Sequence, residues 1–170
     1  MRSRVQVHVD APFERIFPLA AEVERWPERL PHYRYVRRLP AENGERRFAM
    51  GARRGLIPVR WEAIQRPLPD ARRIEFTHTG GVTRGMRVAW RFEPTGIGWD
   101  VIIEHELHLS WPLIGDFAAS RVIGPQFVEA IAWRTLGRVK ALAEELGMRP
   151  LAAHCHLGLG TIDRKLGRDK

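Results

Sequence analysis

Residues 84–109 read RGMRVAWRFEPTGIGWDVIIEHELHL, and this stretch predicts a β-hairpin. Apolar and polar residues alternate on both sides of Pro94-Thr95-Gly96, a sequence typical of a turn. The alternation gathers one set of side chains on a common face: Met86, Val88, Trp90 and Phe92 in the first strand, and Trp99, Val101, Ile103, His105, Leu107 and Leu109 in the second. We expect this largely apolar face to cover a core.

The same period of two extends toward the N-terminus, interrupted by turn sequences. We expect further strands at residues 4–9, 33–39, 46–54, 57–66 and 72–79. The turns between the later strands are Glu42-Asn43-Gly44, Gly55, Pro67-Leu68-Pro69-Asp70 and Gly80-Gly81. Consecutive strands joined by such short turns are typical of an antiparallel meander and not of parallel units with crossover helices.

Two short helices are expected between the first and second strands. Asp10 stands where a helix N-cap belongs, and Ala11-Pro12 and Glu14 suit a first turn. The apolar spacing from Phe13 to Ala20 predicts an amphipathic helix, with Pro18 as a break or kink. A second helical piece is expected over residues 22–30, interrupted at Trp26-Pro27 and closed by Pro31.

The period changes near the C-terminus. Apolar residues recur every three or four positions over residues 128–146, which predicts one long helix: Val128, Ile131, Ala132, Thr135, Val139, Leu142, Ala143 and Leu146. Gly124-Pro125 is expected to kink this helix or mark its start, and Gly147 is expected to cap it. We expect one domain over residues 1–147, followed by a basic, flexible tail at 148–170.

These elements predict an α+β fold with an internal cavity. The apolar face of the sheet and that of the long helix must bury each other. A twisted sheet of seven strands curls around one helix, but a single helix cannot fill the space that it encloses. The earlier strands are expected to direct three further sets of side chains inward: Phe48, Met50 and Ala52; Val59, Trp61, Ala63 and Gln65; and Ile74, Phe76 and His78.

Composition limits the classes of protein. The 170 residues include one cysteine, Cys155, so no internal disulfide can form, and no apolar run is long enough to span a bilayer. A cytoplasmic protein is expected, for which transient contact with a membrane surface stays open. The net charge is +8, but the arginines are scattered along the chain and not gathered in one run, so nucleic acid is not a favoured partner.

The chain resembles the START-like, or SRPBCC, superfamily over residues 1–147. The resemblance is carried by Val7–Pro12 before the first helix, Trp26-Pro27-Glu28 in the second, and Thr135–Glu145 in the last. It is strongest to the polyketide cyclase/dehydrase branch, which includes the coenzyme Q-binding proteins. It implies the helix-grip fold, a curved antiparallel sheet around a long C-terminal helix. It also implies a cavity for a polyketide, an isoprenoid quinone or a lipid.

The resemblance also implies where a cyclase would keep its catalytic groups. In aromatic polyketide cyclases a tyrosine after the Trp-Pro turn and an arginine in the fourth strand are thought to serve catalysis. The tyrosine corresponds to Tyr33, whereas the arginine position falls on Gln65, with Arg66 beside it. A glutamine offers no permanent positive charge to an enolate, although a one-residue bulge would turn Arg66 inward.

His78 and His105 stand on inward faces, where imidazoles act as general acids and bases or as hydrogen-bonding core residues. With Tyr33 they form the candidate catalytic set. The candidate ligand-binding set is Tyr35, Met50, Arg54, Trp61, Gln65, Phe76, Trp90 and Ile103, whose large members could equally be core anchors. His154-Cys155-His156 lacks a third fixed ligand, so no metal and no cofactor is expected.

Three functions fit these features. The leading one is binding of a hydrophobic small molecule in the cavity. The first alternative is an enzyme, a polyketide aromatase/cyclase or dehydratase that uses Tyr33, His78 and His105 with Arg54 or Arg66. The second is a ribosome- or RNA-associated interaction protein, suggested by the positive charge. Oligomeric state is left open.

Overall fold

The computed structural model describes residues 2–41, 44–54, 57–81, 83–107 and 128–145. Its strands are β1 (Arg2–Val9), β2 (Tyr33–Arg38), β3 (Arg46–Arg54), β4 (Ile57–Leu68), β5 (Arg73–Gly81), β6 (Met86–Pro94) and β7 (Trp99–Leu107). They form one sheet in the order β1-β7-β6-β5-β4-β3-β2, and every neighbouring pair is antiparallel. The predicted meander is therefore confirmed, with β1 added beside the last strand.

The hairpin of β6 and β7 has the predicted register. Trp90 lies opposite Ile103 and Val88 opposite His105, so the two alternating faces coincide. At the turn, the amide of Thr95 donates to the carbonyl of Gly98, which has a φ of +73°. A Cβ on Gly98 would lie 2.3 Å from the carbonyl oxygen of Val9, so this tight turn requires glycine.

Three helical segments join β1 to β2: α1 (Phe13–Ala21), the 3₁₀ turn η1 (Val23–Arg25) and α2 (Trp26–Arg29). One expectation for this region was wrong: the N-cap is Pro12, not Asp10, because the helix begins later and the carbonyl of Pro12 accepts the first amides. Of the two expectations for Pro18, a break or a kink, the break does not occur, since the first helix continues through it to Ala21.

The C-terminal helix is described over residues 128–145. Its predicted inner face is buried or half-buried, and Leu136 also lies there with no exposed surface. Two hydrogen bonds join the helix to the end of β1 and the residue after it. Lys140 Nζ donates to the carbonyl of His8 at 2.8 Å, and the amide of Asp10 donates to Glu144. The expectations for Gly124-Pro125, Leu146, Gly147 and the tail at 148–170 lie outside the described residues.

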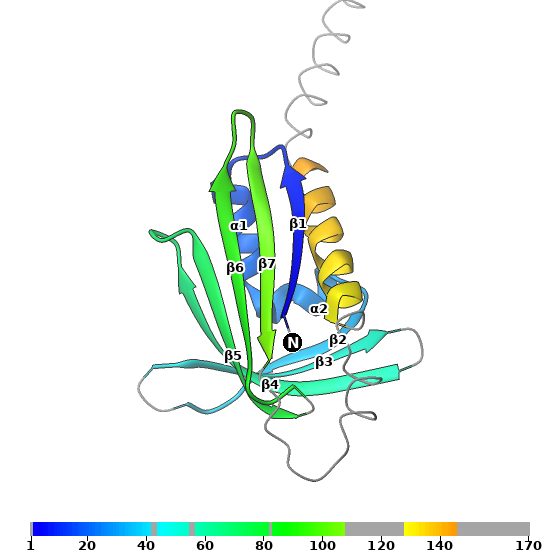
Figure 1. Ribbon diagram of the computed structural model, residues 1–170. Coiled ribbons are helices and arrows are strands. Elements are labelled where there is room, and N and C mark those ends of the chain that lie inside the picture. The colour runs from blue at the N-terminus through cyan, green and yellow to red at the C-terminus, as the bar shows by residue number, and fades with distance from the viewer. Residues whose placement is uncertain (1, 42–43, 55–56, 82, 108–127, 146–170) are drawn as a thin grey trace, which may run out of the picture.

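The sheet curves strongly around these helices. In Figure 1, β2, β3 and β4 run across the view, whereas β1 and β6 run upward and β7 runs downward between them, with the C-terminal helix in yellow and orange beside β1. None of the helices in the described ranges is long and apolar enough to cross a membrane. The fold is the expected α+β helix-grip arrangement.

One end of the space between sheet and helices is filled by aromatic rings. Phe13 of α1 lies 5.1 Å from Trp99 and 5.6 Å from Phe92 between ring centroids, and Phe17 lies 5.4 Å from Phe92. Such contacts close the interior where β6 and β7 meet α1. The unfilled space lies elsewhere, toward α2 and residues 128–135 of the C-terminal helix.

Candidate ligand-binding cavity

A cavity separates the inner face of the sheet from α2 and the C-terminal helix. It is lined by Trp26, Tyr33, Met50, Val59, Trp61, Phe76, His78, Thr83, Met86, Val88, Trp90, Ile103, His105, Val128, Ile131, Ala132 and Thr135. Its volume is about 80 Å³, below the roughly 300–1,000 Å³ that small-molecule sites in proteins commonly have.

Four aromatic side chains form a continuous wall of this cavity. The ring of Trp26 lies 4.9 Å from that of Tyr33 and 5.9 Å from that of Trp90, and Tyr33 lies 6.0 Å from Trp61. The indole nitrogen of Trp26 donates to the carbonyl of Leu19, so the N–H of this ring already has its hydrogen-bond partner. Fixed aromatic rings of this kind give a flat ligand a surface to stack on.

A pair of histidines supplies polar groups to the cavity lining. Nδ1 of His78 lies 2.6 Å from the hydroxyl oxygen of Thr83, and Nδ1 of His105 lies 3.2 Å from that of Ser3. Burial, with the nearby His105, lowers the pKa of His78 to about 3, and burial lowers the pKa of His105 to about 4. Both imidazoles are therefore neutral at pH 7. Within the described part of the chain, the other nitrogen of each ring has no hydrogen-bond partner.

A second polar cluster stands where the C-terminal helix meets the start of β2. The hydroxyl of Thr135 donates to the carbonyl of Ile131 at 2.8 Å and lies 2.9 Å from Nε2 of His32. Thr135 also forms a side-chain hydrogen bond with Tyr33, but burial dominates and raises the pKa of the Tyr33 hydroxyl above its usual range. Tyr33 therefore stays protonated, and its hydroxyl can donate to a ligand oxygen in place of Thr135.

The cavity lining contains no lysine, arginine, aspartate or glutamate among the described residues. Its polar atoms are neutral hydroxyls and imidazoles, and these can bond a carbonyl or a hydroxyl group. A charged ligand group would lose its hydration there without finding an opposite charge, which is costly. The arrangement therefore favours a largely apolar molecule with a few neutral polar atoms.

Most of the predicted site residues come together in this cavity. Tyr33, His78 and His105 of the catalytic set line it, as do Met50, Trp61, Phe76, Trp90 and Ile103 of the ligand-binding set. Trp61 and Trp90 form its wall and do not close the interior. The roles assigned to these residues stay predictions.

Two predicted residues with described side chains, Tyr35 and Gln65, are not part of the lining. Tyr35 faces the other way because an irregularity between Tyr33 and Tyr35 shifts the register with β3, and the extra residue inverts the face. Its ring lies against Gly51, and the guanidinium of Arg37 lies 5.2 Å from its centroid. Arg54 ends β3, opposite Ile57, and its side chain lies outside the described part of the structure.

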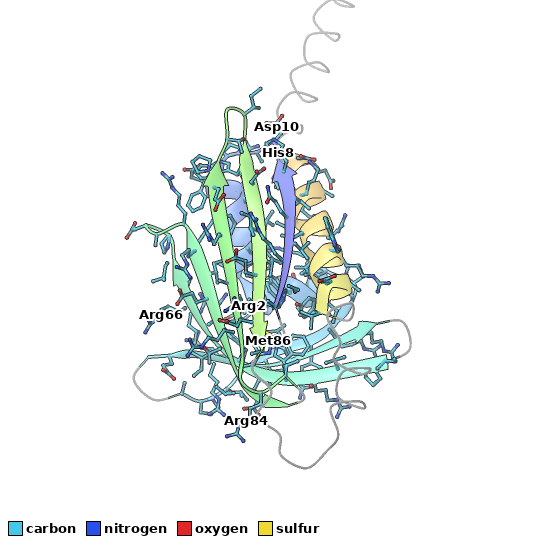
Figure 2. All side chains as sticks on the ribbon, in the orientation of Figure 1. Arg2, His8, Asp10, Arg66, Arg84 and Met86 are labelled. Atoms are coloured by element: carbon cyan, nitrogen blue, oxygen red, sulfur yellow. The ribbon has the colours of Figure 1, made fainter. Side chains whose placement is uncertain are left out.

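Gln65 is buried on the inner face, but its side chain joins two elements of the fold. Its Nε2 donates to the carbonyl of Ala21 at 3.0 Å, which ties β4 to the end of α1, and its Oε1 has no partner in the described part of the chain. The bulge that would turn Arg66 inward is absent from β4 as described: Arg66 is exposed and pairs in register with Glu75, and the shift between β4 and β5 lies at Glu62/Ala63. Arg66 lies at the outer side of the sheet in Figure 2.

Sequence reasoning did not select Trp26, Thr83 or Thr135 as site residues. Trp26 marked a turn between helices, and only the fold brings its ring next to Trp90. Thr83 falls in the turn after β5, where no periodicity applies. Thr135 did stand in the predicted apolar face of the last helix, and a polar residue within such a face was the available signal.

No group of three or more potential metal ligands occurs among the described residues. His154, Cys155 and His156 lie outside them.

The model of a protein family described as "Polyketide cyclase / dehydrase and lipid transport" matches residues 9–130. The chain is 29% identical over 102 residues to the actinorhodin polyketide synthase bifunctional cyclase/dehydratase of Streptomyces coelicolor, a match that covers 59% of this chain. The matched part is 32% of that protein, so the chain spans about a third of its relative.

Solved structures show the same fold. TTHA0849 from Thermus thermophilus is 20% identical with a TM-score of 0.71, over 86% of this chain and 99% of that one. A START superfamily protein from Mycobacterium smegmatis is 13% identical with a TM-score of 0.66, over 85% and 98%. The resemblance read from Val7–Pro12, Trp26-Pro27-Glu28 and Thr135–Glu145 is thus confirmed.

Proposed function

The chain belongs to the polyketide cyclase/dehydrase and lipid transport family, and we propose that it binds an apolar, flat small molecule in the cavity between sheet and helices. A polyketide, an isoprenoid quinone or another lipid would fit this description. The observation that carries the proposal is the uncharged cavity walled by Trp26, Tyr33, Trp61 and Trp90. Burying such a ligand gains roughly 25 cal/mol for each Å² of apolar surface.

The polar groups of the cavity indicate which polar groups the ligand carries. The free nitrogens of His78 and His105 and the hydroxyl of Tyr33 belong to residues that line this cavity. Each can bond a carbonyl or hydroxyl oxygen, and a neutral imidazole can do so as donor or acceptor according to its tautomer. We therefore propose a ligand that carries keto or hydroxyl groups on an aromatic or polyene body.

The test compares two alanines of the C-terminal helix. Ala132 is buried and lines the cavity, whereas Ala141 is exposed on the same helix. Ala132→Phe fills the cavity and should weaken binding of the neutral fluorophore 1-N-phenylnaphthylamine at least tenfold, while Ala141→Phe should leave it unchanged. Native mass spectrometry of freshly purified protein should show a bound small molecule in Ala141→Phe but not in Ala132→Phe. Equal binding by both variants would refute the cavity as the site.

The second candidate function is catalysis, a cyclisation and dehydration of a polyketide chain. It is favoured by the placement of Tyr33 and the two histidines in one cavity, and by the name of the Streptomyces relative. Neutral histidines of low pKa are weak bases, and the described lining holds no cation for a developing enolate. Turnover of a linear poly-β-ketone that falls in both Tyr33→Phe and His105→Ala would support this candidate. Unchanged turnover in both would exclude these residues from it.

A further inference from the structure

A second pocket lies on the outside of the domain, behind the polar cluster at Tyr33 and Thr135. It is lined by Pro31, His32, Arg53, Arg134 and Arg138. These residues come from the turn before β2, the end of β3 and the exposed side of the C-terminal helix. Three guanidinium groups and an imidazole thus converge from three separate segments, and no carboxylate is among the described residues that form the pocket.

These arginines differ from eight others in the described structure. Arg2, Arg4, Arg25, Arg29, Arg46, Arg47, Arg73 and Arg91 each form an ion pair with a glutamate. Arg53, Arg134 and Arg138 form none with any residue of the described ranges. Their mutual repulsion is unrelieved there, and an anion between them would relieve it.

Hydrogen bonds hold the frame of this pocket in place. The amide of Arg53 donates to the carbonyl of His32 at 2.8 Å, which joins β3 to the turn. Nε of Arg138 donates to the carbonyl of Arg29 at 3.2 Å, which fixes the stem of that guanidinium and leaves its two terminal nitrogens available. His32 is held by Thr135 at 2.9 Å. A pre-formed frame lowers the entropy lost when a ligand binds.

We propose that His32, Arg53, Arg134 and Arg138 form a binding site for a phosphate group. Guanidinium groups bind phosphate through paired, charge-assisted hydrogen bonds, and three arginines match its several oxygens. Arg134 already affects the site's histidine, since burial and then the Arg134 charge lower the pKa of His32 to about 4. This inference goes beyond the proposed ligand cavity and does not require that cavity to bind anything.

The test uses two double variants of equal net charge. Arg134→Gln with Arg138→Gln removes two ligands, whereas Arg66→Gln with Arg84→Gln removes two exposed arginines from other parts of the surface, both labelled in Figure 2. Titration of the full chain with inorganic phosphate is followed through the NMR signals of the arginine side chains and of the His32 imidazole. We expect at least tenfold weaker binding in the first double variant and none of this loss in the second.

Two further measurements complete the test. One uses a variant that is expected to fold normally, and the other identifies the source of the phosphate. Arg53→Gln removes a side chain that forms no described hydrogen bond, and it should weaken phosphate binding several-fold without a change in unfolding midpoint. Dodecyl phosphate that binds more tightly than inorganic phosphate, with the gain lost in Ala132→Phe, would identify the head group of a cavity ligand. Equal affinity for both would identify a free phosphate compound.

Three results would overturn the proposal. Phosphate that binds both double variants equally would show attraction by the overall charge of +8 and no defined site. Binding of RNA or heparin without binding of phosphate would assign the surface to a polyanion. No saturable response of His32 or of the arginines would remove the site. Ala132→Phe separates the two proposals, because it should abolish cavity binding and leave inorganic phosphate binding intact.

Discussion

Nδ1 of His78 lies 2.6 Å from the hydroxyl oxygen of Thr83, across the turn that joins β5 to β6. The ring of His78 also stacks on that of Trp61, with centroids 5.9 Å apart and planes inclined by 12°. Thr83 and Trp61 together hold the imidazole of His78 in one orientation. The direction of its other nitrogen is therefore set by the protein before a ligand binds. Pre-organisation of this kind lowers the cost of binding.

Replacing Thr83 with valine tests this relationship. The valine keeps the shape but removes the hydroxyl, and the imidazole nitrogen then loses its partner in a buried setting. We expect the free energy of unfolding to fall by about 1–3 kcal/mol, measured by urea denaturation. Thr77→Val in β5 is the control, because Thr77 is exposed and a surface change costs less than about 0.5 kcal/mol. Equal effects of the two changes would contradict the assigned role of Thr83.

Stability should depend on pH through the two buried histidines. Their pKa values in the folded chain are about 3 for His78 and about 4 for His105, below the value of about 6.5 expected in the unfolded chain. The unfolded chain therefore binds more protons below about pH 6.5, and the free energy of unfolding falls as the pH is lowered toward 4. Each histidine contributes a slope of up to about 1.4 kcal/mol per pH unit.

Urea denaturation between pH 7 and pH 4 measures this slope, and His105→Gln should remove one histidine's share of it. Two-dimensional NMR of the imidazoles provides a direct check. A titration of either ring near pH 6.5 in the folded protein would contradict the burial that the structure assigns to it.

Tyr33 and Tyr35 form a matched pair for ligand recognition. Both stand on β2, but only Tyr33 lines the cavity, because the register shift between them directs Tyr35 to the other face. Tyr33→Phe should weaken binding of 9-fluorenone about tenfold, the free energy of one hydrogen bond to a carbonyl, and should not affect fluorene, which lacks the oxygen. Tyr35→Phe should change neither affinity. Quenching of tryptophan fluorescence measures both ligands.

The outcome for Tyr33 and Tyr35 shows how far the sequence predicts this site. A period of two determined which residues of β4, β6 and β7 face inward, since each of those strands continues its alternation across the cavity wall. It failed at Tyr35, because one extra residue in β2 inverts the face and leaves no mark in the local pattern. An irregularity of this kind depends on the partner strand.

Contacts between distant segments were the other source of error. Gln65 was assigned to the ligand because it shares a face with Trp61, but its amide bonds the carbonyl of Ala21, 44 residues away. Asp10 is a residue type typical of a helix N-cap, but its backbone amide donates a hydrogen bond to Glu144 of the last helix. Both residues were placed in the correct region of the chain, and their partners depend on how the helices pack on the sheet.

Gly81 supports the histidine from the backbone. It ends β5 with a φ of +77°, and a Cβ there would lie 2.3 Å from the carbonyl oxygen of Arg60 and 2.8 Å from Cα of Trp61. Gly81→Ala must therefore strain the backbone or push β5 away from β4, at a cost of about 1–3 kcal/mol. Because this shift would separate His78 from Trp61, binding of 1-N-phenylnaphthylamine should also weaken.

Gly96→Ala is the control for this change, since no atom lies within 4 Å of a Cβ at Gly96 and its φ is not positive. Urea denaturation should show a loss of stability for Gly81→Ala alone. A variant Gly81→Ala that is as stable as Gly96→Ala would mean that β4 and β5 can separate freely at this point. The stacking of His78 on Trp61 would then not be fixed by the sheet, and the ligand itself would have to order the imidazole.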